Sequence, residues 1–472
     1  MEKNQKHKIV LYNPEAVFYD MPLALIALGS CFDKEKYEIV IIDGRLCDGG
    51  QTVLENIEGA VCFGVTVLTG KPIQDALKVT RMVKEKCPDI PTIWGGWHTS
   101  LFPKQPLEEE PSIDITVQGQ GEITFQELVD SFVSKSSLKD VKGICYREEG
   151  QIVQNAPRAI SNMDELPEAD YELIDVEKYF EKKGYRQFDY ITSIGCFYRC
   201  TFCADPYVFG RKFSAISSER MVQTITKYQN KYGFESINFQ DETFFTYRKR
   251  VVGMAEGLID NNISIKWNAT MRADQGDRLS EEDFQLLAKS GFARALVGVE
   301  SGSQEMMDWL KKDIKMEQVT NTAEKCRKAG VAIQFPFIVG FPEESEKAFR
   351  NSVNFVIQLN NMSPKFRPVI FYYKPYPGTP ITDELVRNGY QMPNSLKEWS
   401  QFDYVSNSGP WITEERKQEI ERLKFYIRMA NSKHTLSLVP KTLANFRMKR
   451  SFFKFPIEKT ILDLVKPEQQ LS

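Results

Sequence analysis

The sequence lacks the features that would place it in several common classes of protein. It has no apolar run near the roughly 18 residues of a membrane-spanning helix. Its first residues, MEKNQKHKIVLYNP, lack the apolar core of a signal peptide. The formal net charge of −3 gives no overall attraction to nucleic acid. We therefore expect a globular, cytoplasmic chain, whose 472 residues suggest two or three domains.

Histidine is scarce, and cysteine is unevenly distributed. Only His7, His98 and His434 occur, and three of the nine cysteines fall within residues 196–203. In a reducing compartment, clustered cysteines bind metal or do redox work rather than form disulfides. The other six cysteines are scattered, most of them in apolar stretches, which is typical of small buried side chains.

Short β-rich runs alternate with helical patterns in the first part of the chain. No GxGxxG follows the first run, which argues against a dinucleotide. Continuous apolar strands with helical crossovers predict a doubly wound parallel α/β sheet, with its ligand beyond the carboxyl ends of the strands. The five predicted strands span residues 8–13, 37–43, 60–67, 91–96 and 114–119, and two of the predicted helices span residues 72–87 and 122–134.

A second alternation follows a proline-punctuated, acidic stretch. We expect the first domain over residues 1–137, a linker over 138–186, a partial (β/α)6 barrel over 187–388 and a mostly helical segment over 389–472. In a barrel, the chemistry lies on the loops after the strands. Its predicted strands span residues 187–195, 235–241, 264–270, 293–300, 331–340 and 366–376.

Three cysteines lie on the loop after the first barrel strand, in the run SIGCFYRCTFCADP. Thiolates bind zinc or iron–sulfur clusters, and a closed zinc site takes four ligands. Cys196, Cys200 and Cys203 have no second cysteine pair or histidine pair nearby. Three thiolates would leave one iron of a cubane cluster open to a cofactor, with Phe202 among the aromatic residues that shield it. A zinc knuckle with a distant fourth ligand is the alternative.

The spacing Cys-x3-Cys-x2-Cys, at the start of a six-unit βα barrel, resembles the radical S-adenosylmethionine (SAM) enzymes. The resemblance implies a [4Fe–4S] cluster whose open iron is chelated by the amino and carboxylate groups of SAM. It also implies that reduction of the cluster, by an external donor of the flavodoxin or ferredoxin type, cleaves SAM to methionine and a 5'-deoxyadenosyl radical.

Further barrel loops resemble the SAM-binding loops of that family. In FQDETFF, after the second strand, Asp241 and Glu242 would accept hydrogen bonds from the SAM ammonium, or else begin a helix. Arg272, after the third strand, suits the SAM carboxylate or a neighbouring charge. The next two loops would contact the ribose or carboxylate and the adenine. Their residues are Glu300 and Ser301, for which a glycine-flanked turn is the alternative, and Val339 and Gly340.

Small residues at the strand ends of the first domain resemble the cobalamin-binding domain of cobalamin-dependent radical SAM enzymes. The histidine of the usual Asp-x-His-x-x-Gly motif, which ligates cobalt from below, is absent, and His98 suits the nucleotide tail better. A domain that keeps the fold without cobalamin is the alternative. The cofactor-binding residues expected in this domain are Thr66, Thr69, Gly95, Gly96, His98, Gly119, Gly121 and Glu122.

The resemblance implies methylation of an unactivated carbon, in which the deoxyadenosyl radical removes a hydrogen atom and methylcobalamin delivers the methyl group. The alternatives are an oxidative cyclase, a ring-rearranging enzyme, a methylthiotransferase or a non-enzymatic cobalamin sensor. The small-molecule substrate is not identified by the motifs, and lipids and tetrapyrrole-like molecules are both open. A methylthiotransferase needs three further cysteines for a second cluster, and the remaining cysteines do not show that pattern.

The segment from Arg422 to Lys454 contains nine lysines and arginines and no acidic residue. Apolar residues interleave with these charges, as in LANFRMKRSFFKFP. Such segments lie on anionic membrane surfaces or form solvated basic faces. Peripheral membrane contact is therefore one hypothesis, and packing of a basic face on the acidic linker or the barrel is the other.

Overall fold

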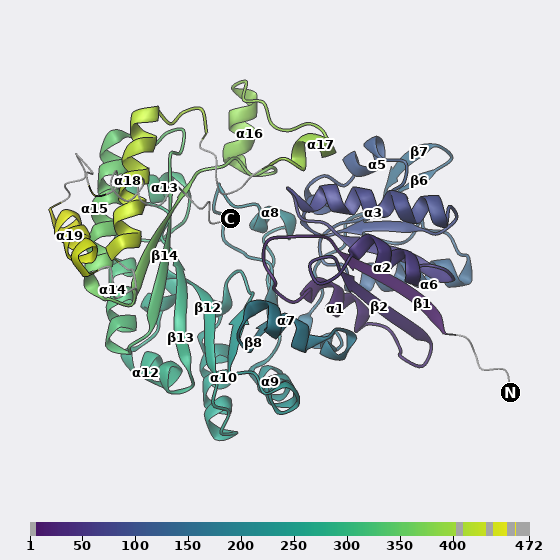
Figure 1. The fold of residues 1–472 in the computed structure, drawn as a ribbon, viewed down its shortest axis with the longest axis horizontal. Coiled ribbons are helices and arrows are strands. Elements are labelled where there is room, and N and C mark those ends of the chain that lie inside the picture. Colours follow the sequence, from purple (N-terminus) through teal and green to yellow (C-terminus); the bar gives the residue numbers. More distant parts are fainter. Residues whose placement is uncertain (1–5, 403–408, 431–437, 451–457, 459–472) are drawn as a thin grey trace. The chain divides into compact units, whose positions relative to one another are not determined.

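The computed structural model describes residues 6–402, 409–430, 438–450 and 458, and its fold is drawn in Figure 1. Contacts group the chain into two compact units. Unit 1 comprises Met1–Glu242, Gly257–Ile265 and Pro375–Tyr404, and unit 2 comprises Thr243–Glu256, Lys266–Lys374 and Val405–Ser472. The first predicted domain and the three-cysteine loop therefore belong to the same unit.

Seven strands form the first sheet, in the order β2-β1-β3-β4-β5-β6-β7. The first five are parallel, and the order β2-β1-β3-β4-β5 is that of a doubly wound domain. Their bounds confirm the five predicted strands: β1 (His7–Asn13), β2 (Tyr37–Asp43), β3 (Ala60–Thr66), β4 (Thr92–Gly95) and β5 (Ile115–Val117).

The remaining two strands overturn part of the predicted linker. β6 (Ile144–Glu148) pairs antiparallel with β5, and β7 (Gln151–Gln154) pairs antiparallel with β6. Glu149 and Gly150, at φ of 48° and 78°, form the two-residue turn between them. Positive φ at both central residues is what a tight hairpin requires, so a local Glu-Gly signal extends the sheet into a stretch that we expected to be irregular.

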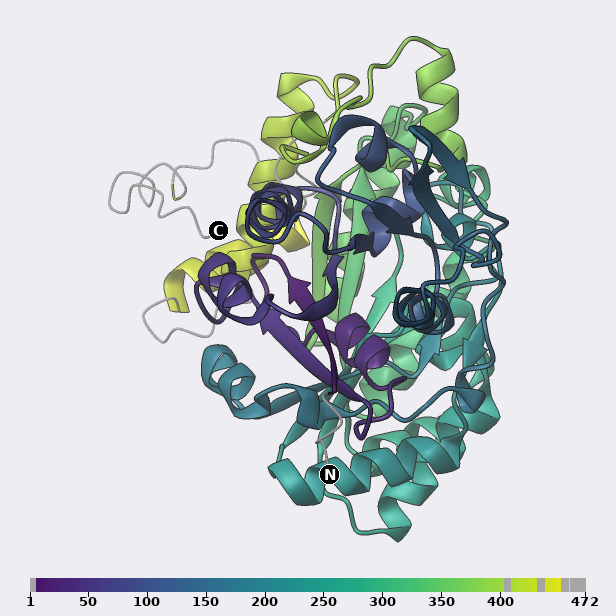
Figure 2. The ribbon, with the colours of Figure 1, turned by 90° about the vertical axis from the view of Figure 1, so that its right-hand side faces the viewer.

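Helices cover both faces of this sheet, as Figure 2 shows. Alternate residues of β1 point to opposite faces: Ile9 and Leu11 enter one core, and Val10 and Tyr12 enter the other. The main helices are α1 (Leu23–Gly29) and α6 (Glu122–Ser134), with residues in the first core, and α2 (Gly49–Asn56) and α3 (Pro72–Lys86), with residues in the second. Two short helices, α4 (Trp97–Leu101) and α5 (Gln105–Glu109), follow β4.

The rest of the predicted linker packs against unit 1. It contains η1 (Met163–Glu165), η2 (Tyr171–Leu173) and α7 (Val176–Lys183). Tyr179 donates a hydrogen bond to Asp43 at 2.7 Å, and Tyr171 donates one to the Asp189 carbonyl at 2.9 Å. Because both tyrosines are buried, these bonds tie the segment to β2 and to the first strand of the second sheet.

Six strands form the second sheet, in the order β15-β14-β13-β12-β11-β8, and its assigned pairings are parallel. These strands confirm the six predicted βα units of a partial barrel. β8 (Gln187–Tyr190) and β11 (Ser236–Phe239) belong to unit 1. The strands of unit 2 are β12 (Lys266–Arg272), β13 (Phe292–Gly298), β14 (Ala332–Val339) and β15 (Phe366–Tyr372).

Amphipathic helices follow the barrel strands. The long ones are α9 (Ser218–Tyr232), α10 (Arg248–Asp260), α12 (Glu281–Lys289), α14 (Met316–Lys328) and α15 (Glu346–Met362). The last part of the chain is helical where it is described: α16 (Pro380–Arg387), α17 (Leu396–Trp399), α18 (Glu414–Ala430) and α19 (Leu438–Lys449). In the described part of the chain, no helix is both long and apolar enough to cross a membrane.

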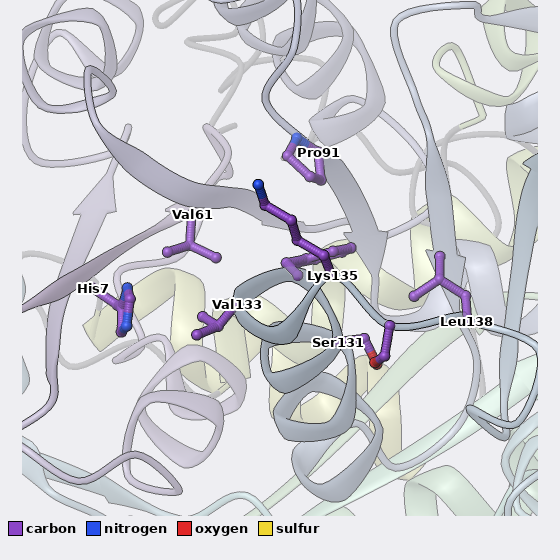
Figure 3. A pocket seen from close by; sticks show the side chains of 9 residues that line it. His7, Val61, Pro91, Ser131, Val133, Lys135 and Leu138 are labelled. Carbon is purple, nitrogen blue, oxygen red and sulfur yellow. The ribbon is translucent and has the colours of Figure 1, made fainter.

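An open hollow of about 550 Å³ lies at the amino-terminal edge of the first sheet (Figure 3). His7 begins β1, Pro91 directly precedes β4, and Lys135 follows the end of α6. Ligands of doubly wound sheets bind at the opposite, carboxyl-terminal edge. The hollow is therefore not a candidate for the predicted cofactor.

Candidate active site

The three cysteines lie on one loop of unit 1 between β9 (Ser193–Ile194) and α8 (Asp205–Val208). Gly195 opens the loop at φ +78°, and a Cβ there would overlap the Lys212 carbonyl oxygen, so only glycine fits. Cys196 and Cys200 are buried, and the backbone N–H of Asp205 donates toward Cys203 Sγ. Burial, followed by the neighbouring Asp205 charge, raises the pKa of the Cys203 thiol above its usual range.

This donor set fits an iron–sulfur cluster better than a single ion. Three soft sulfur ligands on one partly buried loop are typical of such clusters. The zinc alternative requires side chains that converge on one point. In residues 6–402, 409–430, 438–450 and 458, no group of three histidine, cysteine or acidic side chains is placed to hold a single metal ion.

Asp241, after β11, holds the entry to the cysteine loop. Its carboxylate accepts hydrogen bonds from the Thr192 backbone N–H at 3.1 Å, from the Thr192 hydroxyl at 2.7 Å and from the Ser193 hydroxyl. A buried carboxylate with three donors from one turn fixes that turn. The geometry favours this structural role over the predicted contact with the SAM ammonium.

Glu242 and Asp205 form the second acidic feature of unit 1. Asp205 is 6% exposed, and neither of its carboxylate oxygens has a hydrogen-bond partner in the described part of the chain. The same holds for Oε2 of Glu242, which is buried. Burial raises the pKa of Asp205 to about 7. Burial and the nearby Asp205 charge, with a smaller contribution from Asp241, raise the pKa of Glu242 well above its usual range.

In unit 2, Lys312 contacts both Arg272 and Glu300. Arg272, at the end of β12, donates to Asp274 at 2.9 Å and to the Lys312 carbonyl at 2.5 Å. The Lys312 ammonium forms a buried ion pair with Glu300. Glu300 adopts φ +63°, a conformation that costs free energy, and two backbone hydrogen bonds to β14 hold it there. Two ion pairs, Arg272 with Asp274 and Lys312 with Glu300, are thus joined by the hydrogen bond from Arg272 to the Lys312 carbonyl.

Ser301 and Gly340 lie elsewhere in unit 2. The Ser301 hydroxyl is 3.1 Å from that of Ser352 on α15, so it joins a strand end to a helix. Gly340, directly after Val339 at the end of β14, has φ +78°. Its N–H donates to Glu344 at 2.8 Å, and its carbonyl accepts from the Trp411 indole. Gly340 is therefore covered by a side chain from the C-terminal segment in this structure.

The loops of the first domain are bonded to one another. Gly96, at φ +99°, directly follows Gly95, and a Cβ on it would lie 3.0 Å from the Val67 backbone N and O. Thr66, the last residue of β3, directly precedes Val67 in the chain. The Gly119 N–H donates to the Ser100 hydroxyl at 2.9 Å. Gly121 and Glu122 begin α6, and burial raises the pKa of Glu122.

His98, on α4, lies inside the domain rather than at its surface. Its ring is fully buried and packs on Phe102 and Trp399, and Nδ1 is 3.2 Å from the Thr69 hydroxyl. Burial lowers its pKa to about 4, so the ring is neutral near pH 7. Through Nδ1 the ring joins the loops after β3 and β4, whereas its Nε2 is buried and has no hydrogen-bond partner in the described part of the chain.

Known proteins match both parts of the chain. A model of the B12 binding domain matches residues 8–129, and a model of the radical SAM superfamily matches residues 190–356. The chain is a radical SAM enzyme with a B12-binding domain. The radical SAM domain uses a [4Fe–4S] cluster and SAM, and the B12-binding domain provides for cobalamin.

Similar proteins extend over nearly the whole chain. The uncharacterized methyltransferase PH0819 of Pyrococcus horikoshii is 27% identical and aligns over 86% of this chain and 88% of its own. Cytidylyl-2-hydroxyethylphosphonate methyltransferase of Streptomyces wedmorensis is 24% identical over 88% of each chain. The structure of the cobalamin-dependent SAM radical enzyme OxsB superposes with a TM-score of 0.74 at 17% identity, covering 95% of this chain and 76% of OxsB. That likeness confirms the fold.

Sequence reasoning missed two residues of the radical SAM domain. Asp205 follows the third cysteine by two positions inside an apolar run, and only the burial of its oxygens distinguishes it from a helix-starting aspartate. Lys312 lies in an irregular turn between Lys311 and Asp313, both at positive φ. No local pattern in the sequence indicates that this lysine turns inward to Glu300.

Proposed function

We propose that this enzyme methylates an unactivated carbon of a small molecule. When bound, SAM and the reduced cluster supply a 5'-deoxyadenosyl radical, and methylcobalamin supplies the methyl group. The observation that carries the proposal is the combination of a buried three-cysteine loop with a B12-binding domain in one compact unit. Methyltransferases similar over most of the chain support it.

In unit 1, polar residues after the strands fix the loop that would hold the cluster. Asp241 fixes the turn that leads into the cysteine loop. Within unit 2, Arg272 and Lys312 supply positive charge of the kind that a carboxylate group requires, and Asp274 and Glu300 hold these two cations in place. Glycine at position 340 leaves room for the Ile412 side chain to lie against the backbone, and the Trp411 indole donates to the Gly340 carbonyl.

An anaerobic product assay tests this function. The protein is reconstituted with iron, sulfide and cobalamin, mixed with SAM and a reductant, and its nucleosides are separated. A methylase yields both deoxyadenosine and S-adenosylhomocysteine. Deoxyadenosine without the homocysteine would favour the cyclase or rearrangement alternative. A protein that takes up no iron would contradict the whole proposal, as would one that releases neither nucleoside.

We further propose that an acidic electron-transfer protein, of the flavodoxin or ferredoxin type, docks on the outer face of the cysteine loop. Phe197 and Tyr207 are 39% and 37% exposed there, and Arg211 and Lys212 are exposed beside them. Aromatic residues with a cationic rim are typical of interfaces for acidic partners. Arg211 also donates to the Phe197 carbonyl at 3.3 Å, which places one cation next to the ring-bearing segment.

Membrane contact through the basic C-terminal segment is a separate proposal. Leu443 and Phe446 on α19 are exposed, as is Arg450 directly after the helix, and the spacing of Leu443 and Phe446 places them on one helix face. Arg447 instead pairs with Glu458. Lys433 and Lys454 lie outside the described residues, as do the side chains of Lys441 and Lys449. Flotation with anionic but not neutral vesicles, reduced in Phe446→Ser, would support contact, and no flotation at low salt would exclude it.

A further inference from the structure

One face of the sheet in unit 2 is exposed, although parallel sheets are normally covered on both faces. Successive residues of a strand point to opposite faces, and Phe337 of β14 packs on Phe355 of α15, which marks the helix-covered face. Gln334 lies three positions before Phe337, so it points the other way, and it pairs with Leu296 in the middle of β13. Leu296 is 38% exposed there, so this face is open to a ligand.

The residues of β12–β15 that point away from the helices, which we call the open face, are uncharged in the middle of the strands. Cross-strand pairing places them side by side in one patch. Leu296 is exposed and the others are half-buried. The apolar part of a bound molecule would be removed from water on such a patch. The residues of this patch are Thr270, Leu296, Pro336, Ile338, Val369 and Phe371.

Three cations lie at the amino-terminal end of the same face. Lys266 begins β12, and Arg294 and Arg367 lie near the starts of β13 and β15. All three side chains are exposed, and none of them pairs with an acidic side chain in the described part of the chain. By contrast, Lys328 at the end of α14 pairs with Glu281. The charges of the open face are therefore available to an anion.

The distance between the two ends of the open face sets the length of its occupant. Arg294 and Gly298 are four residues apart on β13, which amounts to about 13 Å along a strand. A Cβ on Gly298 would lie 3.0 Å from the Lys312 ammonium, so the buried Lys312–Glu300 pair lies over the carboxyl-terminal end of the face. The face is thus cationic at one end, apolar in the middle and bounded by an ion pair at the other end.

We propose that the open face binds the substrate, and that the substrate is an amphiphile with an apolar chain and one anionic end, a phosphate or a carboxylate. The anionic end lies at Arg294 and Arg367, which leaves the far end of the chain at the carboxyl ends of the strands, where the chemistry of a barrel takes place. This inference rests on the proposed function, because it takes methylation to occur at that end. It adds the class of substrate and places the methylated carbon about 13 Å from the anionic group.

The test compares probes that share one chain and differ in charge. Binding of decyl phosphate, decanoate and decanol to the reconstituted holoenzyme is measured by isothermal titration calorimetry, below the concentrations at which the probes form micelles. We expect both anions to bind saturably and more tightly than the alcohol. Arg294→Gln and Arg367→Gln should each weaken the binding of the anions about 5-fold and leave decanol unchanged. Leu296→Asn should weaken all three probes. The control is Lys289→Gln, which removes an exposed cation at the end of α12.

Every outcome bears on the proposal. The tighter of the two anions identifies phosphate or carboxylate as the recognised group. Absence of saturable binding by both anions, in protein that releases deoxyadenosine and S-adenosylhomocysteine, would overturn the inference and leave the proposed function standing. Equal weakening in Lys289→Gln, an equal loss for decanol in the arginine variants, or unchanged affinities in Leu296→Asn would overturn it too. Protein that binds the probes as expected but takes up no iron would contradict the proposed function alone.

Discussion

The strand-end loops of the two halves of unit 1 differ in how they use their polar groups. In the B12-binding domain the loop residues bond to one another: Thr69 contacts His98, and Gly119 donates to Ser100. In the radical SAM domain, Asp205 and Glu242 have buried oxygens that no other described residue pairs with. The atoms of these loops left buried without a partner among the described residues therefore differ in kind: they are neutral nitrogens in the first domain, His98 Nε2 and Gln120 Nε2, and include carboxylate oxygens in the second.

This difference matches the chemistry of the two cofactors. Cobalamin is large, and a firm edge of small residues can hold it by shape and by backbone contact. SAM is small and carries an ammonium, a carboxylate and a sulfonium, so charged side chains are needed to orient it. We therefore expect substitutions in the strand-end loops of the B12-binding domain to affect cobalamin binding through packing. Substitutions in those of the radical SAM domain should affect SAM binding through charge.

The largest effect is expected in the cysteine loop. Cys200→Ser should reduce bound iron to near zero after anaerobic reconstitution and abolish deoxyadenosine formation, because a serine hydroxyl is a poor ligand for iron–sulfur clusters. Iron analysis and nucleoside chromatography measure both. Cys326→Ser is the matched control, since Cys326 is buried on α14 and outside the loop. Equal iron loss in the control would point to general misfolding.

Much of this arrangement could be predicted from the sequence, and particular residues show where prediction stopped. Apolar runs in the sequence indicated the strands, and the spacing of the three cysteines indicated a metal-binding loop. The β6–β7 hairpin was missed because its signal is confined to Glu149 and Gly150 within an acidic stretch. The roles of Asp241 and His98 depend on partners distant in sequence, such as Thr192 for Asp241 and Trp399 for His98. Periodicity carries no information about such contacts.

The second-largest effect tests whether the strand-end loops of the B12-binding domain hold cobalamin by their shape. Gly96→Val places a branched side chain at φ +99° against the Val67 backbone, so the loop must move. We expect cobalamin retention after desalting, read by absorbance, to fall at least about 10-fold, with bound iron unchanged. Gly59→Ala is the control, because Gly59 also has positive φ but nothing within 4 Å. If Gly96→Val retains cobalamin, the shape of this loop does not determine cobalamin binding.

A third, smaller effect concerns the pH dependence of stability. Burial lowers the pKa of His98 to about 4, whereas an unfolded histidine titrates near 6.5. Between these values the unfolded chain binds the extra proton, so stability is complete above about pH 6.5 and falls as the pH drops toward 4. The loss at pH 5 amounts to about 2 kcal/mol.

Urea midpoints at pH 7.5 and pH 5.0 measure this dependence. His98→Gln should unfold at lower urea overall, yet its midpoint should change less between the two pH values than that of the wild type. Exposed His7 provides the control, since His7→Gln should keep the wild-type dependence. An unchanged pH dependence in His98→Gln would show that the ring is accessible to protons in the folded state.

The smallest effect is expected on the outer face of the cysteine loop, where charge serves a partner rather than a cofactor. Replacing Arg211 and Lys212 by glutamate should slow cluster reduction by an acidic flavodoxin about 5-fold at low salt, and the difference should shrink as salt screens the charges. Stopped-flow absorbance follows the reduction, and the extent of reduction by dithionite should stay the same. The matched control reverses Lys135 and Lys139, two exposed lysines at the far end of α6 and beyond it. If the control slows reduction equally, overall charge rather than this face governs the encounter.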